Sequence, residues 1–355
     1  MQNGKHKTRK LKAKQLSVFA FHFLLFTFCL LSVSGCAESP KLQTAPRPDT
    51  ASVNDLLPEA MQIIQQALVG QDPYIKVNAI EVVAVTKQLG LMPRVERLLR
   101  DDVVPVRFAA ALAVGDVEYH LAERSVKQLL NDQDANVRIA AAYAMFKFGH
   151  PESFNLLSKA ITSKDQVIRA NAALLLGKSG NENALKPLYW TLRDKDSDDR
   201  VRFQAAESIA MLGDEEILPK LWAVVLSSYA DDRVIGIRAM GALGTRKARD
   251  VLVTKLDDDI LEVRLAAAEQ LGMLGYTTGE PEVLDVFRKN LTAGLEPQAR
   301  ERVNVFTALA ISQIGTPQLT KYLPQMLQDQ SKLVRLAAAK AVLQCIMKDQ
   351  SAYKQ

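Results

Sequence analysis

The 355-residue sequence is poor in the residues and motifs on which most enzyme active sites depend. It holds four histidines and three cysteines, no His-Glu dipeptide, no Gly-x-x-x-x-Gly-Lys-Ser/Thr phosphate loop and no Gly-x-Ser-x-Gly nucleophile elbow. The stretch Gly177-Lys178-Ser179-Gly180 is instead typical of a helix end. We therefore expect no catalytic residues, no metal ion and no cofactor, and no small-molecule substrate is evident.

Aromatic residues are also scarce, at 6% of the chain, although 48% of it is hydrophobic. The apolar positions are filled mainly by Ala, Leu, Val and Ile. Ala and Leu are strong helix formers, and Ala lets neighbouring helices approach closely. The composition therefore predicts an all-α fold.

Acidic residues are absent from residues 1–35, which hold six basic ones: Lys5, Lys7, Arg9, Lys10, Lys12 and Lys14. The formal net charge of +5 belongs to this segment, because the remainder carries 39 basic and 40 acidic residues. Binding to nucleic acid needs a basic stripe along one face. We therefore expect no nucleic-acid partner.

An apolar run over residues 16–33 follows the basic segment and ends in Val33-Ser34-Gly35-Cys36. This pattern resembles a bacterial lipoprotein signal peptide, whose lipobox places small residues before an invariant Cys; Val33 stands where Leu is commonest. The resemblance implies that residues 1–35 are removed and that Cys36 carries the lipid, including palmitate. The run is close to membrane-spanning length, so an uncleaved transmembrane helix is the alternative. His22 and Thr27 within the run favour cleavage.

The resemblance also predicts a location in the cell envelope, where two or three acyl chains hold a protein firmly on the membrane. Because Ala37 is not Asp, the lipoprotein-sorting rule implies the periplasmic leaflet of the outer membrane if the host is Gram-negative. Residues 36–53, with three prolines and no apolar period, are predicted to form a flexible tether. Once Cys29 is removed and Cys36 is lipidated, Cys345 remains alone, and we interpret it as a small buried apolar residue.

From about residue 54 the chain repeats a basic residue that follows Val or Ile and precedes a small residue by three positions. Arg107, Arg138 and Arg169 are 31 residues apart, and one step backward reaches Lys76. We call the nine positions the ladder residues: Lys76, Arg107, Arg138, Arg169, Arg202, Arg233, Arg264, Asn304 and Arg335. A second amphipathic segment lies between successive ladder residues, so each unit is predicted to be a helix pair over 54–348, before a polar tail at 349–355.

Two further columns define the repeat. The position three residues after each ladder residue is always small: Ala79, Ala110, Ala141, Ala172, Ala205, Gly236, Ala267, Thr307 and Ala338. Small residues are expected where two helices cross closely. Glycine stands eleven residues after six ladder residues, at Gly149, Gly180, Gly213, Gly244, Gly275 and Gly315, and is predicted to end the helix.

Aspartate stands four residues before several ladder residues, at Asp72, Asp134, Asp165 and Asp198. It is predicted to cap the helix and to be able to pair with a ladder arginine. The segment Asp134-Ala-Asn-Val-Arg-Ile-Ala-Ala-Ala-Tyr-Ala-Met-Phe-Lys-Phe-Gly149 resembles the signature of short bacterial HEAT repeats, also found in phycobilin lyases. The resemblance implies an α-solenoid, a HEAT-like superhelix of about nine helix-pair repeats.

Two repeats depart from the pattern, since Asp232 stands where Val is expected and Asn304 replaces the arginine. Irregular packing is therefore predicted in repeats six and eight. The step from Arg264 to Asn304 is 40 residues, and the nine extra residues are predicted in 276–280 and 292–302. We interpret this insertion as loop length, with a contact site as the alternative.

Positions +5 and +9 from each ladder residue lie opposite the ladder and are expected on the inner, concave surface. Leu112, Tyr143 and Leu174 occupy +5 in repeats two to four, beside Lys147 and Lys178 at +9. An outward apolar stripe of this kind predicts a protein-binding groove; half-burial against neighbouring repeats is the alternative. Separately, Trp190 and Trp222 are predicted to pack in the outer layer of the core, with an aromatic platform as the alternative.

These observations predict a membrane-anchored lipoprotein that acts as a non-catalytic protein-binding scaffold or adaptor in the bacterial cell envelope. Its partners would be proteins of unknown identity, and the lipid would supply the membrane contact. The alternative is an accessory or maturation factor, a lyase-like helper that acts on a substrate protein. The phycobilin-lyase resemblance covers only the scaffold, so it does not imply chromophore chemistry.

Overall fold

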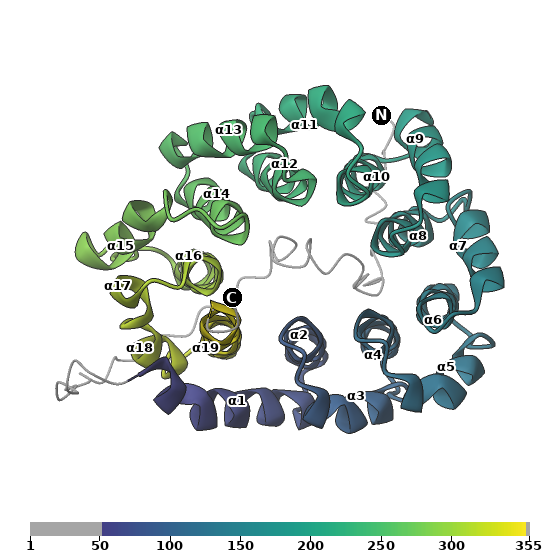
Figure 1. The fold of residues 1–355 in the computed structure, drawn as a ribbon, viewed down its shortest axis with the longest axis horizontal. Coiled ribbons are helices and arrows are strands. Elements are labelled where there is room, and N and C mark those ends of the chain that lie inside the picture. Colours follow the sequence, from purple (N-terminus) through teal and green to yellow (C-terminus); the bar gives the residue numbers. More distant parts are fainter. Residues whose placement is uncertain (1–51, 353–355) are drawn as a thin grey trace, which may run out of the picture.

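The computed structural model describes residues 52–352, and every regular element in that range is helical. The helices form two concentric layers, with one helix of each repeat outside and its partner inside (Figure 1). The predicted α-solenoid is thus confirmed. The predicted signal peptide, Cys36 and all but the end of the tether lie outside the described residues.

Each ladder residue lies on an inner helix. The inner helices are α2 (Pro73–Val85), α4 (Val104–Asp116), α6 (Ala135–Lys147), α8 (Gln166–Lys178), α10 (Asp199–Met211), α12 (Ala230–Leu243), α14 (Leu261–Met273), α16 (Pro297–Ile314) and α19 (Lys332–Ala352). The outer helices are α1 (Leu57–Val69), α3 (Met92–Leu98), α5 (Glu123–Leu129), α7 (Phe154–Ala160), α9 (Leu185–Arg193), α11 (Leu218–Val225), α13 (Arg246–Thr254), α15 (Glu280–Arg288), α17 (Pro317–Thr320) and α18 (Leu323–Leu327). Because α19 reaches Ala352, residues 349–352 of the predicted tail are helical.

The small column lies where neighbouring helices pack most closely. All seven of its alanines and Thr307 have no exposed surface. At Gly236, a Cβ atom would lie 2.9 Å from the backbone nitrogen of Val225 on α11, so even alanine would force the helices apart. The predicted reason for small residues in this column is confirmed.

The predicted helix-ending glycines adopt the left-handed backbone conformation. Their φ angles lie between 64° and 94° in all six repeats that have them. The first two repeats carry Lys87 and Glu118 at the same position, with φ of 50° and 51°. The first two repeats therefore keep the left-handed turn although they lack the glycine that adopts it without strain.

The four aspartates predicted as caps do cap inner helices. Asp72, Asp134 and Asp165 each accept hydrogen bonds from two backbone N–H groups, and Asp198 accepts one from Val201. The ladder residues pair with a different set of aspartates, which lies in the next repeat. The predicted capping is confirmed, whereas the predicted pairing assigned the wrong partners.

Five ladder residues join their repeat to the next one through a side chain 25 residues further along the sequence. The five contacts are Lys76–Asp101 (2.8 Å), Arg107–Asp132 (2.9 Å), Arg169–Asp194 (2.5 Å), Arg233–Asp258 (2.8 Å) and the hydrogen bond Asn304–Asp329 (3.3 Å). Arg138, Arg202 and Arg335 instead donate to carbonyl oxygens of the loop before their own helix, and Arg264 does so while also pairing with Glu282. The ladder thus cross-links loops along one rim of the stack.

The two repeats with unusual sequences keep this geometry. Arg233 pairs with Asp258 although Asp232 precedes it, and Asp232 accepts a hydrogen bond from Ser227 at 2.7 Å. Asn304 reaches Asp329 as an arginine would. The irregular packing predicted for repeats six and eight is therefore not seen in the ladder contacts. The nine-residue insertion lengthens the loop after α15 and extends α16 to 18 residues.

The solenoid closes into a ring, which the repeat pattern did not predict. Figure 1 shows α19 of the last repeat beside α1 and α2 of the first, and α19 packs against both. The Gln328 amide also donates to the Glu59 carboxylate across this seam. Lys340 of α19 pairs with Glu81 of α2 at 3.7 Å. The inner helices therefore surround a central space on all sides.

Candidate functional site: a charged cavity inside the ring

Side chains at +5 and +9 of the inner helices line a cavity of about 430 Å³ inside the ring. Its walls come from α2, α10, α12, α14, α16 and α19, so residues more than 250 positions apart in sequence share it. For these six repeats, the prediction that +5 and +9 face the concave side is confirmed. Ring closure turns that concave surface into a partly open cavity, in which Val85 and Met273 are 42% and 47% exposed.

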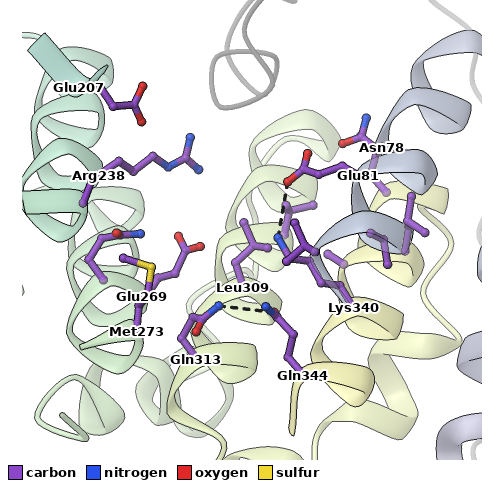
Figure 2. Close-up of a pocket in the computed structure, with 18 of the residues that line it drawn as sticks. Asn78, Glu81, Glu207, Arg238, Glu269, Met273, Leu309, Gln313, Lys340 and Gln344 are labelled. Atoms are coloured by element: carbon purple, nitrogen blue, oxygen red, sulfur yellow. Dashed lines mark hydrogen bonds and ion pairs between the residues drawn. The ribbon is translucent and has the colours of Figure 1, made fainter. Parts of the chain in front are cut away.

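Charged side chains face one another across this cavity (Figure 2). On one wall, Glu81 of α2 pairs with Lys340 of α19 at 3.7 Å. On the other wall, Glu207, Arg238 and Glu269 occupy +5 on the consecutive helices α10, α12 and α14. The second wall thus places one guanidinium between two carboxylates.

Glu207 is almost fully shielded from water and Glu81 only in part, since 26% of the Glu81 side chain is exposed. Glu207 is 5% exposed and accepts a hydrogen bond of 2.9 Å from Gln204. Burial raises the pKa of Glu207 above its ordinary value, although Arg238 and this hydrogen bond lower it in part. Burial likewise raises the pKa of Glu81, against the lowering effect of Lys340, of Lys178 and of Arg238 across the cavity.

The remainder of the lining is apolar or carries amides. Met211, Met273 and Leu309 supply flexible or aliphatic surface, and Gln313 donates to Gln344 at 3.5 Å. Pockets with apolar walls and a few polar groups are typical of sites for small molecules. Methionine adds adaptability, because its unbranched side chain fills irregular space.

A smaller cavity of about 60 Å³ adjoins the first and shares Glu81, Val85 and Met211 with it. Leu112 and Leu174 line it together with Lys178. The Lys178 ammonium pairs with Asp116 at 3.1 Å. This part of the ring interior is therefore neutral and mainly apolar.

The apolar stripe predicted at Leu112, Tyr143 and Leu174 does not stand out as an exposed groove. The three side chains are 7%, 2% and 3% exposed, respectively. The Tyr143 ring covers Gly115 of α4, where a Cβ atom would lie 3.0 Å from the ring, and its hydroxyl donates to Asp116 at 2.7 Å. The predicted outward exposure is wrong, and the alternative of burial against a neighbouring repeat is confirmed for Tyr143. Leu112 and Leu174 instead line the smaller cavity.

The two lysines predicted to flank that stripe do reach the inner side. Lys147 pairs with Glu118 at 3.0 Å, and Lys178 pairs with Asp116 at 3.1 Å. Both pairs join a repeat to an earlier one, so the lysines have structural partners. Contact of these residues with another protein stays a prediction.

The remaining sequence predictions have mixed outcomes. Cys345 is a buried free thiol, as predicted, and burial raises its pKa to about 11. Trp190 and Trp222 are 49% and 48% exposed on the outer helices α9 and α11. Their predicted place within the core is therefore wrong, although Trp190 lies against the Arg169 guanidinium, 5.4 Å from the ring centre.

Within 52–352, no group of three or more His, Cys, Asp or Glu side chains is arranged to hold a metal ion. In the same range, no helix is both long and apolar enough to span a bilayer.

The charged half of the +5 column is the part of the site that sequence reasoning missed. Glu81, Glu207, Arg238, Glu269 and Lys340 belong to the same column as the apolar stripe. Their alternation of sign over repeats five to seven was the available signal. The sequence alone could not show that these residues share a site, because only ring closure brings the first and last repeats opposite repeats five to seven.

Comparison with known proteins bears on the fold. The description of HEAT repeats matches three overlapping stretches, 122–196, 156–235 and 225–305. Among curated proteins, none matches the chain. Solved structures with a similar course include the complex of CpcE and CpcF of phycocyanin lyase from Nostoc, at 18% identity, a TM-score of 0.41, and coverage of 71% of this chain and 94% of that one.

Human deoxyhypusine hydroxylase is 17% identical, with a TM-score of 0.37, over 74% of this chain and 98% of its own. Importin beta is 16% identical, with a TM-score of 0.34, over 82% of this chain and 47% of its own. At this level of similarity, the activities of these proteins do not transfer. The matched repeats cover more than half of the 355 residues, and the chain therefore belongs to the HEAT-repeat family.

Proposed function

We propose that this protein is a membrane-anchored lipoprotein and a non-catalytic protein-binding scaffold in the bacterial cell envelope. The lipid would be carried by Cys36, and residues 37–53 would let the ring stand clear of the membrane surface. In a Gram-negative host, Ala37 favours the periplasmic leaflet of the outer membrane. The lipid would also raise the local concentration of the ring near membrane partners.

The observation that carries the scaffold proposal is the large outer surface of a closed HEAT-repeat ring. Repeat proteins bind other proteins through extended surfaces that no single pocket provides. Half-exposed Trp190 and Trp222 lie on successive outer helices, and Leu226 and Tyr229, in the loop after α11, are 62% and 72% exposed. Exposed aromatic residues are frequent anchors in protein interfaces.

The anchor is tested by Cys36→Ser in the full chain. We expect the variant to keep residues 1–35, to lack the lipid by mass spectrometry, and to lose attachment through acyl chains. Cys345→Ser is the matched control and should be processed and lipidated like wild type. A Cys36→Ser chain with the same processing and membrane attachment as wild type would show that an uncleaved helix is the anchor.

The scaffold is tested by cross-linking in intact cells before membranes are solubilised. We compare wild type with the double variant Trp190→Ser, Trp222→Ser, because half-exposed side chains can be shortened without opening the core. Leu121→Ser, at a residue 79% exposed in the turn before α5, is the control. We expect one or more specific proteins to fall at least tenfold with the double variant only. Equal recovery of every cross-linked protein from all three chains would contradict the proposal.

A further inference from the structure

The cavity inside the ring has one carboxylate more than its cations can balance. Among its lining residues, Glu81, Glu207 and Glu269 are acidic, whereas Arg238 and Lys340 are basic. Glu81 and Lys340 form one ion pair across the seam. Lys178 also acts on Glu207 from the adjoining cavity, but its ammonium is paired with Asp116 at 3.1 Å. Two carboxylates, Glu207 and Glu269, then share the guanidinium of Arg238. An uncompensated charge held out of water is costly, so the site favours an additional cation.

Glu269 supplies a second and independent observation. Its Oε2 atom is buried, yet among the described residues it has no hydrogen-bond partner. Figure 2 shows this side chain directed into the cavity from α14, beside Met273 and on the same wall as Arg238. Buried acceptors are almost always satisfied in folded proteins. Since no protein donor within 52–352 occupies this oxygen, a ligand that enters the cavity and carries an N–H or O–H group can donate to it.

The apolar lining defines what should carry that donor. Met273 lies one helical turn after Glu269 on α14, Met211 is on α10, and Leu309 faces them from α16. A bare metal ion would gain nothing from this surface, whereas an alkyl chain would bury apolar area against it. The cavity volume of about 430 Å³ lies in the range of small-molecule sites.

We propose that the cavity is a binding site for a small organic cation, a primary ammonium group carried on an aliphatic chain. The ammonium would donate to Glu269 Oε2 and lie near Glu207, and the chain would rest on Met211, Met273 and Leu309. The raised pKa of Glu207, caused by its burial, is consistent with a carboxylate that lacks sufficient positive charge. This site is inside the ring and does not depend on the lipid anchor or on an outer protein partner.

The test uses four probes of matched size or charge. Hexylammonium, hexan-1-ol, hexanoate and potassium ion are titrated separately into the full chain at constant ionic strength, and binding is measured by calorimetry. We expect the dissociation constant of hexylammonium to be at least tenfold lower than that of hexan-1-ol, with no saturable heat from potassium or hexanoate. Equal affinity for hexanoate, or saturable binding of potassium with the same strength, would overturn the proposal.

Variants then locate the site. Glu269→Gln keeps the side-chain shape and should weaken hexylammonium binding at least tenfold. Met273 is 47% exposed, so Met273→Lys should be accommodated and should place a tethered ammonium near Glu269, again with at least a tenfold loss. Met273→Leu keeps an apolar surface and should bind within threefold of wild type. Each variant is first compared with wild type by circular dichroism and thermal melting.

If Glu269→Gln does not fold, the Met273→Lys and Met273→Leu variants still decide the test. Unchanged hexylammonium affinity in Met273→Lys would show that the probe binds elsewhere and would refute the site. Loss of affinity in Met273→Lys but not in Met273→Leu would support it, since only the first adds a competing charge.

Discussion

At the scale of single residues, the helix-ending turns show which positions carry backbone strain. Lys87 occupies with φ of 50° the site that Gly149, Gly180 and four other glycines fill later in the chain. A residue with a Cβ atom loses about 1–2 kcal/mol in the left-handed conformation, and glycine does not. Glycine in turn loses more backbone entropy on folding, by roughly 0.5–1 kcal/mol.

Lys87→Gly should therefore stabilise the protein by about 0.5–1 kcal/mol, because the relieved strain exceeds the added entropy loss. The measurement is the free energy of unfolding from denaturant titration. Gly180→Ala introduces the strain at the equivalent turn, where φ is 68°, and should change stability in the opposite direction. A destabilised Lys87→Gly chain alongside a neutral Gly180→Ala chain would show that the turns tolerate either residue.

Glu207 provides a pH-dependent prediction. Burial raises the pKa of its carboxyl in the folded state, so as pH rises above the ordinary value of about 4.3 the unfolded chain ionises first. The unfolded chain then holds fewer protons than the folded one, and stability falls with pH until the folded pKa is passed. Glu207→Gln lacks this loss and should be more stable than wild type at pH 7, with the difference shrinking towards pH 4.

Thermal melting of both chains between pH 4 and pH 8 checks this result. Glu215→Gln, at an exposed position outside the ring, should leave the pH profile of wild type unchanged. If Glu207→Gln were less stable at every pH, its charge would be stabilising the ring through Arg238.

At the scale of helices and repeats, the ladder explains how one hairpin is tied to the next. The basic residues were predictable, since their 31-residue spacing is visible in the sequence. Their carboxylate partners were not, because the acidic residue stands six positions before the next ladder residue in most repeats. It is thus closer in sequence to an arginine that binds its backbone carbonyl and not its carboxylate. The nearer aspartates are engaged by backbone N–H groups of the helix start. The spacing alone does not show which aspartate caps a helix and which one pairs with a ladder arginine.

Arg233→Met and Arg138→Met form a matched pair for measuring the ladder. Arg233 is 8% exposed and pairs with Asp258, so its loss leaves a buried carboxylate and should cost about 3 kcal/mol. Arg138 donates to carbonyl oxygens of its own loop, and the position 25 residues later is Ser163. Its substitution should cost about 1 kcal/mol. Equal losses by denaturant titration would mean that the inter-repeat ion pair adds nothing to the loop contacts.

At the scale of the whole molecule, the sequence predicted the repeat but not the ring. Curvature accumulates from small rotations between successive repeats, and these depend on side-chain packing at each interface. The prediction of an exposed stripe failed for the same reason, because it too depended on packing between repeats. The Tyr143 ring lies on Gly115 of the preceding repeat and does not point inward. Ring closure also forms the candidate site, because it brings Glu81 and Lys340 together from opposite ends of the repeat array.

Ring closure is tested by joining its two ends. Glu59 of α1 and Gln328, just after α18, contact each other through their side chains although 269 residues separate them. The Glu59→Cys, Gln328→Cys chain should therefore form an intramolecular link with a short bismaleimide, identified by mass spectrometry of the joined peptides. Glu59→Cys with Asp199→Cys is the control, since Asp199 lies on α10 across the ring and its side chain is 82% exposed. An open solenoid would hold its first and last repeats apart, so failure of the first pair to link, with both thiols modified singly, would contradict closure and with it the cavity inside the ring.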